Sequence, residues 1–177
     1  MRTRHPKTYL CTMLLDDEYF MRAALAEAKE ALAIDEVPIG AVIVANGKII
    51  ARGHNQVEKL NDVTAHAEMI AFTSAANNMG GKFLSDCILY VTLEPCPMCA
   101  GAIVHARVAR VVFGAADPRT GAAGSVFNLL QTETLNHRAD LRGGVLAEEC
   151  GTLLRDFFRT RRTKPLYGGD VDRLSAG

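Results

Sequence analysis

Two short segments constrain this chain more than any other part of its sequence. The first, TAHAE, contains His66 and Glu68, and the second, EPCPMC, contains Cys96 and Cys99. The histidine and the two cysteines offer three ligands for zinc and leave a fourth tetrahedral position for water, as catalytic zinc sites require. Glu68 stands close to His66 in the sequence, where it can move protons to and from that water. The two segments therefore predict a catalytic metal site with Glu68 as its acid and base.

The alternative is a closed structural zinc site, for which Cys87 is the candidate fourth ligand. Cys87 precedes an apolar, β-rich run that ends just before Cys96. An extended strand of this length, at ~3.3 Å a residue, would separate the two cysteines by roughly 20 Å or more. We therefore expect Cys87 to lie away from the metal and the site to be open.

Length and composition indicate one globular domain. The chain has 177 residues, of which 49% are hydrophobic, enough for a packed core. Lys+Arg and Asp+Glu number 20 each, so any nucleic acid must be held by a local basic patch. Five cysteines with one C-x-x-C pair fit a metal site in a reducing compartment better than a disulfide framework. No apolar run is long enough to span a membrane.

We expect the domain to occupy residues 16–164, between a leader at 1–15 and a flexible tail at 165–177. The leader carries basic residues and then an apolar run that is too short for a signal peptide and is followed by acidic residues. We expect the leader to be disordered or dispensable, and Met13 is an alternative start of the chain.

Hydrophobic periodicity and turn signals predict an α/β domain. A helix capped by Asp16 or Asp17 ends before Pro38, and Asn46-Gly47 joins two β-rich runs in a hairpin. The remaining pattern predicts helices at 65–79, 97–106 and 147–162 and strands at 88–93, 107–114 and 139–143. This order is typical of a three-layer α/β/α arrangement, with helices on both faces of a mixed sheet.

Both metal-binding segments are predicted at helix N-termini. Thr64 is the expected N-cap of the helix at 65–79, and a proline suits the start of the helix that carries the cysteines. A helix N-terminus favours thiolate over thiol. His66 and Glu68 would diverge by about 200° along an ideal helix, so they can flank one metal only near the first turn.

Residues 115–136 form a predicted irregular loop with a short helix at 126–130. Loops of this length inside a compact domain are often functional. Asp117, Arg119 and Thr120 are the candidate contact residues of the loop, with a solvated loop as the alternative.

The predicted last helix ends in a cluster of positive charge. Its basic residues, set against Asp156 alone, are Arg155, Arg159, Arg161, Arg162 and Lys164. This cluster fits an anion-binding patch, as RNA requires, and equally fits compensation of the helix dipole. The adjacent Phe157 and Phe158 favour nucleic acid, because an aromatic ring can stack on an unpaired base.

The sequence resembles the bacterial tRNA-specific adenosine deaminases, zinc enzymes of the cytidine deaminase-like group that convert the wobble adenosine of certain tRNA anticodons to inosine. The resemblance runs from about Asp17 to Arg162. Beyond the two metal-site segments and the strand before the cysteines, it is carried by EVPIGAV (36–42), GHN (53–55), VVFGA (111–115), TGAAGS (120–125), NHR (136–138) and DFFR (156–159). The last four lie outside the general zinc motif and point to the tRNA branch.

The resemblance implies a five-stranded cytidine deaminase-like sheet, one zinc ion per subunit, a cytoplasmic homodimer and a base flipped out of a tRNA anticodon stem-loop. Carried over by position, Asn55 contacts the target base and Asp117 the nearby ribose, with the backbone of Ala67 and Glu94 framing the base. The residues implied to contact the anticodon loop are Phe158, Arg159 and Arg161. Ala116 and Val63 depart from the family, which often has Arg and Pro there, and Ala116 bears on one phosphate contact.

Two other functions share part of this pattern. A free-base or nucleotide deaminase, of the guanine or cytosine type, would use the same zinc motif. A non-catalytic RNA-binding subunit would keep zinc for structure alone, and Glu68 argues against it because a structural site has no use for that carboxylate.

Overall fold

A five-stranded sheet organises the part of the chain that the computed structural model describes, residues 16–163. The elements follow one another as α1 (Asp17–Ala33), β1 (Gly40–Ala45), β2 (Lys48–His54), α2 (Val57–Leu60), α3 (Ala67–Met79), β3 (Cys87–Leu93), α4 (Pro97–Ala106), β4 (Arg110–Ala115), the 3-10 helix η1 (Leu129–Gln131), β5 (Asp140–Arg142) and α5 (Ala147–Thr163). The predicted leader and tail lie outside the described residues.

The sheet is mixed, as predicted. Its strand order is β2-β1-β3-β4-β5, with β1 antiparallel to both neighbours and β3, β4 and β5 parallel to one another. Because β3 and β4 are parallel neighbours, their carboxyl ends meet at one edge of the sheet. Ligand sites of open α/β sheets form at this edge.

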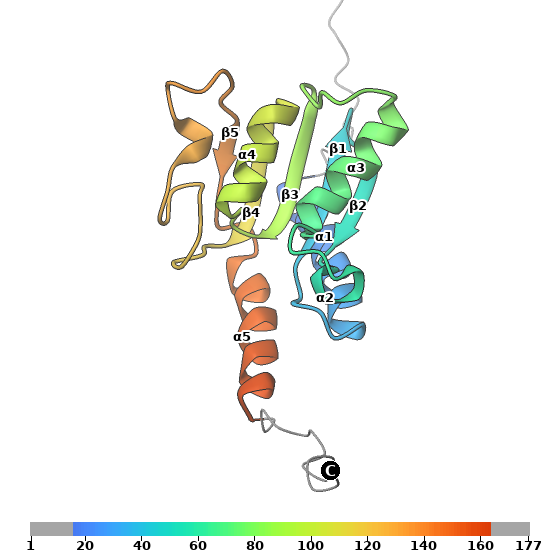
Figure 1. Ribbon diagram of the computed structural model, residues 1–177, viewed down its shortest axis with the longest axis vertical. Coiled ribbons are helices and arrows are strands. Elements are labelled where there is room, and N and C mark those ends of the chain that lie inside the picture. Colours follow the sequence, from blue (N-terminus) through green and yellow to red (C-terminus); the bar gives the residue numbers. More distant parts are fainter. Residues whose placement is uncertain (1–15, 164–177) are drawn as a thin grey trace, which may run out of the picture.

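Helices cover both faces of the sheet, which confirms the three-layer prediction (Figure 1). On one face, α3 and α4 contribute Phe72 and Ile103 to a core with the sheet. On the other face, α1 and α5 pack through Met21 and Cys150. Burying a side chain of this kind contributes roughly 1.5–3 kcal/mol, so the two cores fix the sheet edge from which the site is built.

Local sequence signals set several of these elements. The Asp16 side chain accepts a hydrogen bond from the Tyr19 N–H at 2.9 Å and so caps α1, as predicted. Asn46 and Gly47 have φ values of 51° and 71°, the left-handed pair that a tight hairpin turn needs. The almost wholly buried β1 lies inside the sheet, between β2 and β3.

The predicted cap of the helix at 65–79 is wrong. Both the backbone N–H and the hydroxyl of Thr64 donate to Asp62 Oδ1, at 2.8 Å and 2.7 Å, so Thr64 belongs to the preceding turn. The helix begins at Ala67, and His66 occupies the N-cap position.

Other elements also differ from the prediction. The strand expected at 107–114 begins at Arg110, because Arg107 ends α4 in the left-handed conformation. The helix expected at 126–130 is the single 3-10 turn η1. The short helix α2 had no hydrophobic period to predict it.

A buried carboxylate joins α1 to three strands at the sheet edge away from the metal ligands. Asp17 accepts hydrogen bonds from Tyr90 on β3 at 2.8 Å, from both Arg110 Nη atoms on β4 at 3.0 Å, and from Arg142 on β5 at 2.5 Å. Burial alone would raise the pKa of Asp17, but the hydrogen bonds from Tyr90 and Arg110 outweigh burial and leave the pKa below its ordinary value.

Asp17→Asn is expected to lower the free energy of unfolding by about 2 kcal/mol at neutral pH, because Arg110 loses its buried partner. Since the pKa of Asp17 is lowered by folding, its contribution is complete above the unfolded pKa of roughly 4 and is lost as the pH falls through the folded pKa. The difference in free energy of unfolding between wild type and variant, measured by urea unfolding, should therefore disappear in acid. Asp140→Asn is the control: Asp140 lies 3.1 Å from Arg110 Nε but is 73% exposed, so its loss should cost below about 0.5 kcal/mol. An equal loss of unfolding free energy in the two variants would contradict the role of Asp17.

Candidate metal centre and substrate cavity

The three predicted ligands lie at the N-termini of two helices. His66 is the N-cap of α3 and Cys96 the N-cap of α4, both with extended backbones (φ −70°, ψ 155° and φ −74°, ψ 171°). Neither N-cap side chain bonds to its helix, so both are available to a ligand. Pro97 opens α4, and Cys99 lies in its first turn.

The ligand atoms have the spacing that zinc requires. His66 Nδ1 lies 3.7 Å from Cys96 Sγ and 3.6 Å from Cys99 Sγ, and all three atoms lie within 4.8 Å of one another. Tetrahedral zinc, with bonds of about 2.3 Å to sulfur and 2.0 Å to nitrogen, would place a nitrogen and a sulfur about 3.5 Å apart. The residues present therefore fit a zinc ion.

Cys87 is separated from this group by the length of one strand. It starts β3, whereas Cys96 follows the other end of that strand, and its Sγ lies 3.6 Å from Met79 Sδ. Among residues 16–163, the candidate metal group holds His66, Cys96 and Cys99 without Cys87. The geometry supports the prediction of an open site.

The pKa values of the two cysteines are shifted in opposite directions. The hydrogen bond from Cys99 is the largest cause that lowers the pKa of Cys96, to about 4, and His66 adds to it. The pKa of Cys99 is raised, because Cys99 holds the proton of that hydrogen bond and its side chain is buried. Cys96 is thus ready as a thiolate ligand, as expected at a helix N-terminus.

Glu68 lies in the first turn of α3 and is only 4% exposed. The angular conflict between His66 and Glu68 does not arise, because His66 is extended and precedes the helix. Burial raises the pKa of the Glu68 carboxyl. A carboxyl whose pKa is raised in this way holds a proton more readily than an exposed one, which favours general acid–base work.

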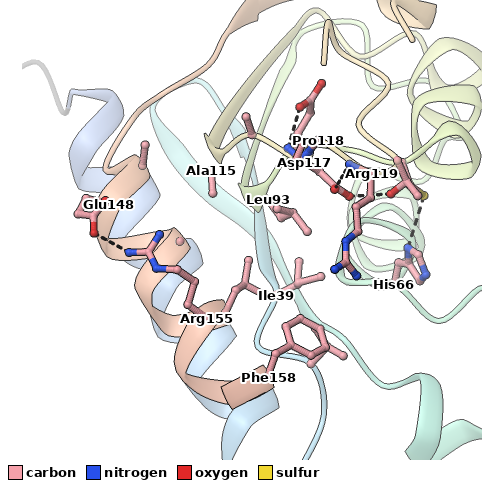
Figure 2. A pocket seen from close by; sticks show the side chains of 18 of the residues that line it. Ile39, His66, Leu93, Ala115, Asp117, Pro118, Arg119, Glu148, Arg155 and Phe158 are labelled. Carbon is pink, nitrogen blue, oxygen red and sulfur yellow. Dashed lines mark hydrogen bonds and ion pairs between the residues drawn. The ribbon is translucent and has the colours of Figure 1, made fainter. Parts of the chain in front are cut away.

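A cavity of about 1070 Å³ opens in front of these residues. Its metal end is formed by His66, Glu68 and Cys96, and one side is the loop Asp117–Thr120. Figure 2 shows Arg155 and Phe158 projecting from α5, with Arg155 on the far side of the cavity from His66. The volume exceeds what one base needs, so there is room for more of a polymer substrate.

The structure brings most of the predicted site residues to this cavity. Those that line it are His66, Glu68, Glu94, Cys96, Asp117, Phe158 and Arg161. Cys99 and Ala67 are completely buried, and Asn55 is 4% exposed. Of the two departures from the family, Ala116 lines the cavity and Val63 is 79% exposed.

The two phenylalanines of α5 have different roles. Phe157 is 7% exposed and belongs to the core, whereas Phe158 is 47% exposed and free to stack. Arg161 donates to the Asp35 carbonyl at 2.5 Å and lies over the Phe157 ring. Arg159 instead pairs with Asp156 at 2.9 Å on the helix surface. Three arginines of α5 line the cavity together with Phe158, namely Arg155, Arg161 and Arg162.

Two buried carboxylate side chains have roles that were not predicted: Glu36 was not among the predicted site residues, and Glu94 was predicted to act through its backbone alone. Glu36, 1% exposed, accepts from the Asn55 amide at 3.1 Å and from the Lys59 N–H at 2.8 Å, so it fixes the orientation of Asn55. The Glu94 side chain, 2% exposed, accepts four hydrogen bonds from the loop 117–125. Each carboxylate adjoins an apolar strand, and this was the signal available in the sequence.

Comparison with known proteins places the chain among deaminases. The family model of the MafB19-like deaminases matches residues 15–162. The tRNA-specific adenosine deaminase of Bacillus subtilis (strain 168) is 53% identical over 151 residues, covering 85% of this chain and 94% of the relative. That of Aquifex aeolicus (strain VF5) is 50% identical over 145 residues, covering 82% and 95%.

Solved structures agree with these relatives. A structure from a study of A-to-I editing by tRNA:A34 deaminases at the wobble position of transfer RNA is 46% identical, with a TM-score of 0.75, over 77% of this chain and 99% of that one. The guanine deaminase of Bacillus subtilis is 33% identical, with a TM-score of 0.56, over 87% and 98%. The chain therefore belongs to the MafB19-like deaminases and, within them, to the family of the tRNA-specific adenosine deaminases.

Proposed function

We propose that this protein is a zinc-dependent hydrolase that converts the wobble adenosine of a tRNA anticodon to inosine, with release of ammonia. The observation that carries the proposal is the buried Glu68 beside the three-ligand group, at one end of a cavity whose other end is the basic helix α5. Relatives at 50% and 53% identity that are named tRNA-specific adenosine deaminases support the substrate.

His66, Cys96 and Cys99 would hold the zinc ion, which when bound lowers the pKa of a water in its fourth position. The work of the chain's own residues centres on Glu68. Its carboxylate takes a proton from the attacking water and passes it to the ring nitrogen beside the reacting carbon. It then takes the remaining proton of the hydroxyl group that has added to this carbon and gives it to the amine, which leaves as ammonia while the carbonyl forms. Burial of Glu68 keeps competing water away from this proton.

The RNA side of the proposal rests on α5 and the loop 117–125. The exposed ring of Phe158 can stack on a base of the anticodon loop, and the neighbouring arginines can meet its phosphates. Asp117 stands at the cavity wall, where the family implies a ribose contact. Asn55, held by Glu36, is proposed to contact the base that the backbone of Ala67 and Glu94 frames.

The similarity to a guanine deaminase gives a second candidate, deamination of a free base. A free base would fill only part of the 1070 Å³ cavity and would leave the α5 wall without a partner. The third reading, a zinc-containing RNA-binding subunit without activity, gives no reason to bury a carboxyl beside the ligand group.

The deciding experiment incubates the zinc-loaded protein with an anticodon stem-loop that carries a wobble adenosine and measures inosine by mass spectrometry of the digested RNA. We expect inosine at that position only. The same stem-loop with its adenosine moved to a neighbouring position is the matched control. Guanine, cytosine and adenine are tested as free bases in parallel. Turnover of a free base with an unchanged stem-loop would replace the proposal by the small-molecule reading.

We further propose that the enzyme is a homodimer that acts in the cytoplasm, where tRNA is processed. The exposed apolar side chains Val126 and Phe127 support an interface near η1. Light scattering measures the mass, and a monomer at working concentration would overturn the dimer. Within residues 16–163 the structure contains no helix of the length and hydropathy needed to cross a bilayer.

A further inference from the structure

The Glu94 carboxylate is surrounded by donors from one loop. Oε2 accepts from the Asp117 N–H at 2.9 Å and from the Ser125 hydroxyl, and Oε1 accepts from the Ala123 and Ser125 N–H groups at 3.0 Å each. Four donors on a carboxylate that is 2% exposed form a closed arrangement. The loop is therefore wrapped around this one side chain.

The chain passes so close to Glu94 that only glycine fits at position 121. A Cβ on Gly121 would overlap the Glu94 carboxyl group and the Asp117 carbonyl. The Gly121 N–H donates to that carbonyl at 2.9 Å, and the Ala122 N–H donates to the Pro95 carbonyl at 2.8 Å. The loop is thus fastened both to Glu94 and to the residue that precedes the ligand Cys96.

The opposite side of the same loop faces the cavity. Asp117, Arg119 and Thr120 line the wall near the metal end. The Asp117 carboxylate is itself fixed, because it accepts from the Arg119 N–H at 2.9 Å and from the Thr120 hydroxyl at 2.6 Å. Any displacement of the loop from Glu94 would move these groups relative to His66 and Cys96.

We propose that the Glu94 side chain is a positioning residue, which holds the loop 117–125 in register with the metal ligands and thereby sets how tightly the RNA substrate is bound. The role differs from the framing of the base by the Glu94 backbone, and it rests on the proposed function for its substrate. Glu94 does not touch the reacting atoms in this role. Its loss should therefore act on substrate binding more than on the chemical step.

Glu94→Gln keeps the shape of the side chain but sets an amide NH₂ group against N–H donors, so the loop loses part of its anchor. We expect KM for the stem-loop, and Kd from fluorescence anisotropy, to rise about tenfold or more, since misplaced contacts of this kind cost up to 10²-fold. The value of kcat at saturation should change by less than about threefold. Bound zinc should stay the same. Glu133→Gln, an exposed carboxylate beyond the same loop, is the control and should leave all four quantities unchanged.

Two further variants distinguish a positioning role from a simple loss of folded protein. A loss of folded protein would lower the measured kcat and leave KM unchanged. Gly121→Ala pushes the loop and the Glu94 carboxylate apart while keeping that carboxylate, and it should give the same rise in KM, with little added effect in the double variant. Ser125→Ala removes only the hydroxyl donor and should raise KM by about two- to fivefold. If Glu94→Gln does not fold, these two variants decide the matter.

Tryptic cleavage after the exposed Arg119 reports the loop without any RNA. We expect cleavage there to be faster in Glu94→Gln and Gly121→Ala than in wild type. The positioning role would be overturned if wild type forms inosine and both variants keep its cleavage rate, KM and Kd. Faster cleavage in a protein that forms no inosine would leave the loop anchor standing and overturn the proposed function instead.

Discussion

Replacement of Glu68 by alanine is expected to lower kcat for inosine formation by about 10²- to 10⁴-fold, the usual contribution of a general acid–base group. The carboxyl lies 4% exposed in the first turn of α3, next to the His66 ligand. The variant removes the group that carries the proton from water to the ring and to the leaving amine. Single-turnover assays on the stem-loop measure this loss, and metal analysis should show zinc unchanged, because the three ligands are intact.

The matched controls for Glu68 test charge and packing separately. Glu68→Gln keeps the side-chain volume and should be as inactive as Glu68→Ala, since an amide cannot carry the proton. Glu30→Gln removes an exposed carboxylate on α1 and should leave kcat unchanged. An active Glu68→Gln enzyme would show that the proton is carried by another group.

Cys99→Ala is expected to remove zinc and, with it, all measurable turnover. The first turn of α4 would keep Cys96 but lose one of three ligands, and two protein ligands do not make a stable zinc site. The zinc content found by metal analysis should fall from about one ion per chain towards zero. Added zinc should raise the thermal midpoint of the wild type but not that of the variant, because only a protein that binds the metal is stabilised by it.

Cys87→Ala is the matched control for Cys99→Ala. Cys87 and Cys99 are both completely buried, so the two substitutions create similar packing defects. We expect Cys87→Ala to keep zinc and activity and to lose only stability. Loss of zinc from Cys87→Ala would restore the closed four-ligand site that the geometry of β3 argues against.

Much of the fold and of the metal centre could be predicted because the signals are local. The Asn46-Gly47 turn, the Asp16 cap and the Pro97 start of α4 each depend on residues within one turn of chain. The grouping of His66, Cys96 and Cys99 could also be predicted, since zinc restricts both the residue types and their spacing. Competition between local signals caused the error at Thr64, whose hydroxyl has two uses and goes to Asp62.

The substrate side could not be predicted in the same detail because it depends on tertiary contacts. Nothing local distinguishes Arg159, which pairs with Asp156, from Arg155, which reaches the cavity. Glu94 was expected to act through its backbone, and only the folded loop reveals four donors around its side chain. Long-range partners of this kind leave no periodic trace in a sequence.

The site is assembled from two stretches that are separate in the chain. The ligands and Glu68 lie between residues 66 and 99, whereas the opposite walls come from the loop 117–125 and from α5. Changes in α5 can therefore alter what enters the cavity without touching the reacting groups. Redesign of this enzyme for a new nucleic acid should begin in its last third and leave residues 66–99 as they are.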